Sequence, residues 1–206
     1  MTQRQVLVIV EDELSGAVMR RLIASFACHL ELFRLIRHSG YGQIKANVPQ
    51  YRSASKAMPH IILTDLDRHE CPPSLLMQWD ASALPAAVSM HVAVHEVEAW
   101  LLADREGMAS LLKLPLNKVP LKPEAEPDPK QCLINLARRY GPARVKRDLV
   151  PEQGSSARIG PGYNAVLGQF VATNWNPARA CEYSPSLARA SVRLRSFMCE
   201  PNSQGG

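Results

Sequence analysis

Near its start the chain carries the stretch Gln5-Val6-Leu7-Val8-Ile9-Val10-Glu11-Asp12-Glu13, an apolar run that ends in three acids. The run does not alternate between apolar and polar residues, which predicts a strand buried on both faces of a parallel sheet. A second stretch, His60-Ile61-Ile62-Leu63-Thr64-Asp65-Leu66-Asp67, has the same form and ends in two aspartates. Because strands of a parallel sheet present functional side chains at their carboxyl ends, both stretches point to a site there.

A third apolar run, at 90–94, precedes Glu96 and Glu98. Residues i and i+2 of a strand share one face, so we expect Asp65 and Asp67 to point the same way. The same holds for Glu96 and Glu98 if their segment stays extended. Carboxylates held close together repel each other unless a cation neutralises them. Oxygen clusters suit Mg²⁺ or Mn²⁺, and such a cation could polarise a phosphoryl oxygen and activate water.

Acids that follow strands also have a structural interpretation. A carboxylate at the start of a helix accepts hydrogen bonds from backbone N–H groups and so caps the helix. Asp12 or Glu13 could do only that, and Glu96 and Glu98 could be acids of a first helical turn. Both interpretations are open at the level of the sequence.

The segments between the runs carry helical patterns. Apolar residues at helical spacing predict a helix over 14–35, and the strand–helix order opens an α/β unit. Further helices are predicted within 47–58, from Pro72 onward, and at 99–104, 130–140, 162–170 and 185–197. Five prolines in 114–129 exclude a long helix there and predict a loop or lid. We therefore expect an α/β core at 1–113, a proline-rich loop at 114–129, a helical extension on the core at 130–199 and a disordered tail at 200–206.

Composition narrows the class of protein. The chain has 206 residues, of which 46% are hydrophobic, enough for the core of one domain. No run of about 18 apolar residues occurs, and no secretory signal begins the chain, so we expect no membrane contact. Five scattered cysteines without zinc-site spacing favour a reducing cytoplasm. The net charge of +5 is compatible with a polyanionic partner.

Basic side chains are candidates for binding phosphate or a nucleic-acid backbone. The segment 138–147 is strongly basic and either tracks a backbone or simply ends a soluble helix. Other candidates flank the acids or lie in or beside loops. The basic candidates are Arg68, Lys130, Arg138, Arg139, Arg144 and Arg158. His69, His91 and His95 are either general bases, metal ligands or ordinary hydrogen-bonded histidines. No GxSxG, Walker or GxGxxG sequence is present.

The order of these motifs resembles the Toprim domain, which topoisomerases, primases and the OLD (overcoming lysogenisation defect) nucleases share. More narrowly, the chain resembles a Toprim-like family, domain of unknown function 4276. The quoted pieces are Val10-Glu11-Asp12-Glu13-Leu14-Ser15, Leu63-Thr64-Asp65-Leu66-Asp67 and His95-Glu96-Val97-Glu98-Ala99-Trp100-Leu101-Leu102. The resemblance implies a Rossmann-like, mostly parallel central sheet flanked by helices, with a helical C-terminal extension.

The resemblance also implies roles for single residues. Glu11 matches the Toprim glutamate, and Asp65 and Asp67 match the Asp-x-Asp metal ligands. Glu98 is the further acid, and Lys130 faces a phosphate. The chain departs from many Toprim nucleases in having Asp12 in place of a glycine and Ser15 in place of a second acid.

Three functions follow, in order of preference. The first is a Mg²⁺- or Mn²⁺-dependent nuclease that hydrolyses DNA or RNA, with a partner ATPase of the AAA or ABC type and a role in phage defence. Its catalytic residues would be Glu11, Asp65, Asp67, Glu98 and Lys130, and its metal ligands Glu11, Asp65, Asp67, Glu96 and Glu98. The second is a non-catalytic subunit that docks onto an ATPase or senses a nucleotide, which Ser15 favours. The third is a phosphatase or phosphotransferase acting on small phosphate esters. A homodimer is compatible with each.

Overall fold

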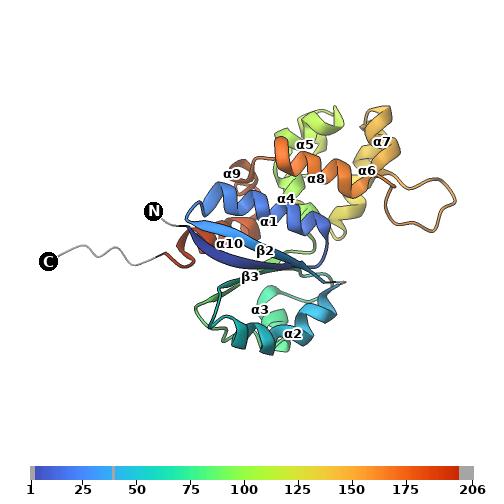
Figure 1. The fold of residues 1–206 in the computed structure, drawn as a ribbon. Helices are drawn as coiled ribbons and strands as arrows, with labels where there is room; N and C mark the ends of the chain where they lie inside the picture. Colours follow the sequence, from blue (N-terminus) through green and yellow to red (C-terminus); the bar gives the residue numbers. More distant parts are fainter. Residues whose placement is uncertain (1–2, 39, 200–206) are drawn as a thin grey trace.

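A computed structural model describes residues 3–38 and 40–199 of the chain. Within these residues a four-stranded sheet forms from β1 (Arg4–Val10), β2 (Leu30–Arg37), β3 (His60–Asp65) and β4 (Val88–Ala93), all parallel, in the order β2-β1-β3-β4. The sheet is the central layer of the molecule (Figure 1). The three strands predicted from apolar runs are confirmed as β1, β3 and β4. The tail predicted at 200–206 lies outside the described residues.

Both faces of the sheet are buried, which explains the unbroken apolar runs. Val6, Val8 and Val10 of β1 belong to one hydrophobic cluster, whereas Ile9 belongs to another. Successive side chains of a strand point to opposite faces, so each run must be apolar throughout.

Helices cover the two faces unequally. Helices α2 (Tyr41–Ala54) and α3 (Pro72–Gln78) lie on one side of the sheet, and the remaining helices lie on the other (Figure 1). These are α1 (Glu13–Phe26), α4 (Val97–Ala103), α5 (Arg105–Leu112), α6 (Pro129–Tyr140), α7 (Ala143–Leu149), α8 (Tyr163–Thr173), α9 (Pro177–Ala180) and α10 (Pro185–Ser196). The expected α/β class, with helices at the C-terminal end, is confirmed. None of the described helices is both long and apolar enough to cross a bilayer.

The strand order creates a point where the chain changes direction. From β1 the chain passes through α1 to β2, and from β2 it returns through α2, on the other face, to β3 on the far side of β1. Crossovers between parallel strands are right-handed, so a reversal of direction moves the helix to the opposite face. The carboxyl ends of β1 and β3 are therefore the topological switch point of the sheet, where open α/β sheets place their ligands.

The helix predicted over 14–35 is wrong in its second half. Helix α1 ends at Phe26, and the residues from Leu30 onward form β2, which pairs with β1. Leu32 and Leu35 pack against the core, whereas Phe33 is 57% exposed. Apolar residues at 30, 33 and 36 fit a helical spacing, but pairing with the buried β1 overrides that local pattern. Helix α2 also begins earlier than predicted, at Tyr41.

The proline-rich segment 114–129 is packed onto the helices. It forms two short 3-10 turns, Leu116–Lys118 and Pro123–Ala125. The Glu124 carboxylate accepts hydrogen bonds from the Ser184 hydroxyl and from Ser186, through its N–H (2.9 Å) and its hydroxyl (2.7 Å). Ser186 in turn accepts from Trp100 Nε1 at 2.7 Å. These contacts fix the segment to α4 and α10.

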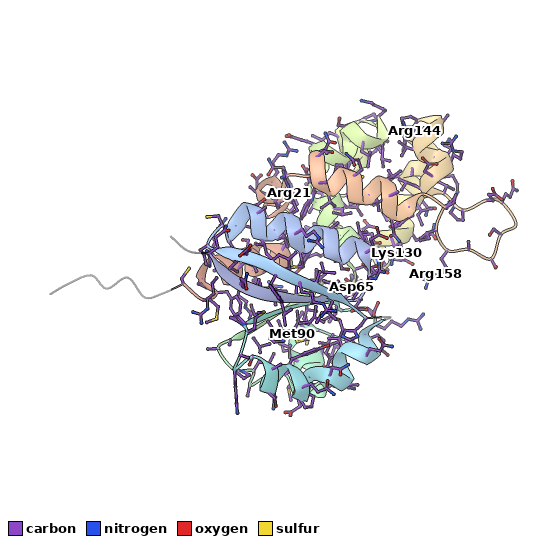
Figure 2. The ribbon with its side chains drawn as sticks, viewed as in Figure 1. Arg21, Asp65, Met90, Lys130, Arg144 and Arg158 are labelled. Atoms are coloured by element: carbon purple, nitrogen blue, oxygen red, sulfur yellow. The ribbon has the colours of Figure 1, made fainter. Side chains whose placement is uncertain are left out.

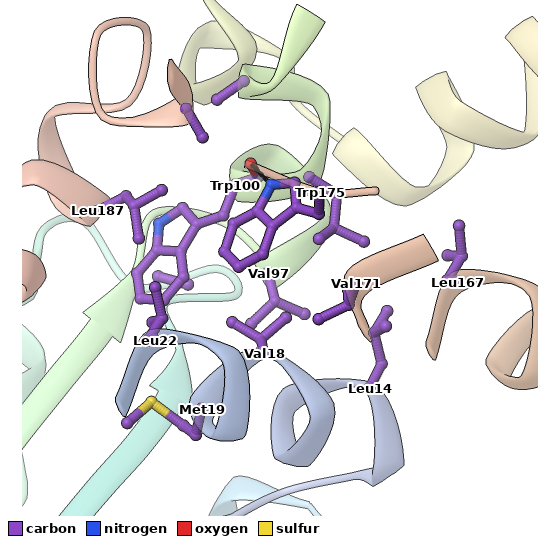
Figure 3. Packing of buried hydrophobic residues seen from close by; sticks show 14 of the residues in the cluster. Leu14, Val18, Met19, Leu22, Val97, Trp100, Leu167, Val171, Trp175 and Leu187 are labelled. Carbon is purple, nitrogen blue, oxygen red and sulfur yellow. Dashed lines mark hydrogen bonds between the residues drawn. The ribbon is translucent and has the colours of Figure 1, made fainter. Parts of the chain in front are cut away.

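One hydrophobic cluster joins the C-terminal helices to the sheet (Figure 3). Trp100 of α4 and Trp175, which follows α8, are fully buried at its centre and pack over Val18 and Leu22 of α1. Trp175 Nε1 donates to the carbonyl of Trp100 at 3.2 Å, so the indole has its hydrogen bond inside the cluster. The helical extension and the α/β core therefore share one interior.

A buried carboxylate holds α9 against α5. Asp104 is fully buried, caps α5 through the N–H of Gly107 (3.2 Å) and accepts from the N–H of Asn176 (2.7 Å). Arg179 binds both of its oxygens, at 2.9 and 3.1 Å. A Cβ at Gly107 would overlap the Asp104 carboxylate, so glycine is required there.

We expect Arg179→Ala to lower the free energy of unfolding by about 3 kcal/mol, because it leaves the buried Asp104 carboxylate without its counter-charge. Arg147→Ala is the matched control, since Arg147 pairs with Asp148 through a side chain that is 72% exposed, and such pairs contribute about 0–1 kcal/mol. Urea denaturation followed by circular dichroism measures both. Equal losses in the two variants would contradict the role given to Asp104.

Candidate functional site

The carboxyl ends of β1 and β3 place Glu11 and Asp65 together at the switch point of the sheet. Glu11 directly follows β1, and its Oε1 accepts hydrogen bonds from the Asp65 N–H (3.0 Å) and from the Thr64 hydroxyl. Burial raises the pKa of Glu11, although these two hydrogen bonds act in the opposite direction. The Glu11 side chain is thereby fixed against the end of β3.

Asp65 connects β3 to the start of α4. Its Oδ1 accepts a hydrogen bond from the N–H of Val97, the first residue of α4, at 3.0 Å. Burial, followed by the nearby charges of Glu98 and Glu11, raises the pKa of Asp65 well above its ordinary value. The carboxylate is therefore costly to ionise unless a cation lies beside it.

Glu98 completes an inner group of acids. It lies in the first turn of α4 with 1% of its surface exposed, and its Oε1 accepts from the Tyr163 hydroxyl of α8 at 2.9 Å. Its Oε2 is buried and has no hydrogen-bond partner among residues 3–38 and 40–199. Burial raises the pKa of Glu98 to about 7. We call Glu11, Asp65 and Glu98 the inner acids.

Asp67 and Glu96 form an outer pair. Burial and the charge of Glu96 raise the pKa of Asp67. The expectation that Asp65 and Asp67 share a strand face is wrong, because β3 ends at Asp65 and Asp67 adopts a left-handed φ of 50°. Glu96 and Glu98 do not share an extended face either, since α4 begins between them at Val97.

Lys130 bridges the outer and inner acids. At the start of α6, its Nζ lies 2.9 Å from Glu96 Oε1 and 3.6 Å from Glu98 Oε1, and its backbone N–H donates to Glu96 Oε2 at 3.1 Å. Burial acts to lower the pKa of Lys130, but Glu98 and Glu96 outweigh it and raise that pKa. The ammonium group therefore stays charged and offsets part of the negative charge of the site.

Asp12 caps a helix, which is the structural interpretation of an acid that follows a strand. Its Oδ1 accepts from the N–H of Ser15 at 2.7 Å and caps α1. Glu13 is exposed in the first turn of the same helix, and Ser15 is buried. The first acidic cluster thus contributes Glu11 to the inner acids and uses Asp12 to begin the helix.

Two of the predicted arginines lie near the acids. Arg158 is close enough to Asp67 for its charge to lower the pKa of that carboxyl, and Arg68 lines a hollow together with Asp67. Lys130 and Arg158 lie at the same end of the sheet as Asp65, whereas Arg144 lies on the far side of the helical layer (Figure 2).

Arg138 and Arg139 are not brought to the acids. They lie eight and nine positions after Lys130 along α6, which corresponds to about 12–14 Å at 1.5 Å per residue. Arg138 bonds Asn135 at 2.6 Å, and Arg139 lies over the ring of Tyr140. The basic segment 138–147 is therefore a separate exposed surface.

The sequence interpretation missed two partners of the inner acids, Thr64 and Tyr163. Thr64 was assigned only to a strand, and the contact between Tyr163 and Glu98 joins positions 65 residues apart. No local pattern signals such a contact. Tyr163 stood only within the segment predicted as a helix over 162–170.

The donor set fits a hard divalent cation in kind. The inner acids supply only oxygen ligands, and Glu98 Oε2 is a buried acceptor that lacks a donor within the described residues. In that same part of the chain, however, no three His, Cys, Asp or Glu side chains are grouped closely enough to hold a metal ion. Side chains of the site would therefore have to shift to complete a coordination sphere.

Comparisons with known proteins find distant structural likeness. No family model and no curated protein matches the chain. The C-terminal region of the Burkholderia pseudomallei OLD protein is similar with a TM-score of 0.43 and 15% identity, over 92% of this chain and 96% of that chain. The C-terminal region of the Xanthomonas campestris pv. campestris OLD protein is similar with a TM-score of 0.33 and 17% identity, over 86% of this chain and 96% of that chain. No function follows from similarity at this level, and membership of the domain of unknown function 4276 family stays a prediction.

His91 is buried within β4, where its Nε2 lies 3.0 Å from the Ser89 hydroxyl. Burial and the nearby Arg193 lower its pKa to about 3, so the native protein holds the ring neutral. The unfolded chain protonates it below its ordinary pKa of 6.5, and stability is therefore lost as the pH falls from 6.5 toward 3. The hydrogen bond and burial indicate a structural histidine.

We expect His91→Phe to remove this acid lability, because phenylalanine does not titrate and a cavity of about 350 Å³ beside His91 gives it room. The difference in unfolding free energy between wild type and variant should change by about 2 kcal/mol, in favour of the variant, between pH 7 and pH 5. Urea denaturation at the two pH values measures this. A difference independent of pH would refute the assignment.

Proposed function

We propose that the chain is a Mg²⁺- or Mn²⁺-dependent phosphodiesterase of Toprim-like organisation that hydrolyses nucleic acid. The observation that carries the proposal is the convergence of the inner acids at the switch point of the sheet, with a buried oxygen of Glu98 that lacks a donor among the described residues. Burial raises the pKa of each of these acids, because their ionised forms are unfavourable without a nearby positive charge. A bound cation would stabilise the ionised forms.

The inner acids Glu11, Asp65 and Glu98 would hold the cation, with Asp67 and Glu96 beside them. When bound, the cation polarises a phosphoryl oxygen and lowers the pKa of water. Tyr163 orients the Glu98 carboxylate through its hydroxyl.

Basic residues around the acids supply the contacts to phosphate. Glu96 accepts one hydrogen bond from the Lys130 backbone N–H and one from the Lys130 ammonium, and so holds this side chain in place. Lys130, with Arg68 and Arg158, would bind the phosphate and stabilise charge that develops on it. Arg138, Arg139 and Arg144 would bind the backbone of a longer nucleic acid farther from the reaction.

A second candidate is a non-catalytic subunit, and the ion pairs of Lys130 favour it. The ammonium group between Glu96 and Glu98 offsets part of the negative charge of the site without a metal. Such a protein would use the same end of the sheet to bind a partner or a nucleotide. The sequence resemblance supports a partner ATPase and a role in phage defence, and the five scattered cysteines support a cytoplasmic location.

We expect Asp65→Asn to lower the Mn²⁺-dependent cleavage of plasmid and single-stranded substrates at least 100-fold, because even partners of metal ligands contribute about 10–100-fold. Asparagine keeps an oxygen for the Val97 N–H, so the fold is preserved. Glu13→Gln is the control, since Glu13 is an exposed acid two residues from Glu11. Equal cleavage by wild type and Asp65→Asn would exclude the proposed reaction.

Lys130→Met tests the phosphate contact given to this lysine, and the wild-type protein measured beside it separates the two candidates. In a phosphodiesterase we expect this variant to lower the cleavage rate about 100-fold, because it removes a positioned cation that stabilises charge on the phosphate. Mn²⁺ binding, measured by calorimetry, should persist. Lys118→Met, which changes an exposed lysine, should leave both unchanged. If wild type binds no Mn²⁺ and cleaves nothing, the non-catalytic candidate replaces the first.

A further inference from the structure

A hollow of about 330 Å³ includes Asp67 of the outer pair in its wall. Tyr41, Asp67, Arg68 and His69 line it. Asp67 belongs both to this hollow and to the group of charges around Lys130 and Arg158. A ligand in the hollow would therefore lie directly beside the proposed reaction centre.

Two aromatic rings form a corner in this hollow. The rings of Tyr41 and His69 have centroids 6.1 Å apart and planes at 88°. Tyr41 is also stacked on Trp79, at 6.1 Å and 16°. Trp79 is 3% exposed, whereas Tyr41 is 46% exposed. A buried indole thus fixes the orientation of a ring that otherwise faces solvent.

Charge and shape at the corner suit one class of ligand. An aromatic wall accepts any nucleobase, because every base has a π-face. Arg68 lines the same hollow and is exposed, and Lys130 and Arg158 are close enough to Asp67 for their charges to lower its pKa. A base against the rings would place its phosphate among these cations and beside the acids.

We propose that Tyr41 and His69 bind an unpaired base next to the phosphate that is cleaved, so that the substrate is single-stranded DNA or RNA. The proposal rests on the proposed function, of which it names the substrate. A base inside a duplex is stacked on both faces and reaches such a corner only after it is unstacked. An unpaired strand has no such cost, and the corner therefore selects against duplex.

Binding without cleavage tests the proposal. We would measure fluorescence anisotropy in EDTA with labelled 12-nucleotide adenine strands, of DNA and of RNA, and with a hairpin duplex. We expect wild type to bind the single strands more tightly than the hairpin, and Tyr41→Ala to weaken single-strand binding about 10-fold or more. Tyr41→Phe keeps the ring and should retain the affinity. Hairpin binding should not change in either variant.

Two further variants keep the test decisive. Phe33→Ala removes an aromatic ring of similar exposure, 57%, on β2 outside the hollow, and should bind like wild type. His69→Ala removes the second wall without touching the contact of Tyr41 with Trp79, and should also weaken single-strand binding. Thermal denaturation identifies any variant that fails to fold.

The outcomes distinguish this proposal from the proposed function. If Tyr41→Ala and His69→Ala weaken single-strand binding but the wild type cleaves nothing, the base site is supported and the proposed phosphodiesterase function is rejected. Cleavage by wild type with equal affinity for single strand and hairpin, or with no effect of Tyr41→Ala and His69→Ala, would overturn the base site alone.

Discussion

A buried carboxylate at the start of α4 organises the site. Glu98 is almost fully enclosed, and a buried charge is stable only with partners. Those partners come from segments far along the chain: the Tyr163 hydroxyl from α8 and the Lys130 ammonium from α6. The helical extension is therefore part of the site, since it supplies the groups that accompany the acids of the α/β core.

The same arrangement depends on the hydrophobic cluster behind it. Trp100 lies two residues after Glu98 on α4 and packs with Trp175 over α1. Ser186 and Glu124 tie the Trp100 indole to α10 and to the proline-rich segment. Because α4, α8 and α10 share this interior, the distance between Glu98 and Tyr163 is set by packing that lies outside the site.

Much of the fold and part of the site follow from local patterns. β1 and β3 are apolar and rich in β-branched residues, and both their positions and the acids at their ends are predictable from these patterns. The helices that begin at Pro72, Pro129 and Pro185 are predictable because proline suits a first helical turn. β2 is not predictable in this way, because its apolar spacing also fits a helix and only its pairing with β1 decides between them.

The sequence by itself determined that acids follow three apolar strands in a basic chain, since strand burial and residue identity are local properties. Only the tertiary structure decided how those acids are divided. Glu11, Asp65 and Glu98 converge, Asp12 caps a helix, and Asp67 and Glu96 form an outer pair with Lys130 beside them. The physical reason is that a strand end, a helix start and a left-handed residue aim neighbouring carboxylates in different directions. The hydrogen-bond partners of Glu11, Asp65, Glu96 and Glu98 lie 32 to 65 positions away, beyond the reach of any local pattern.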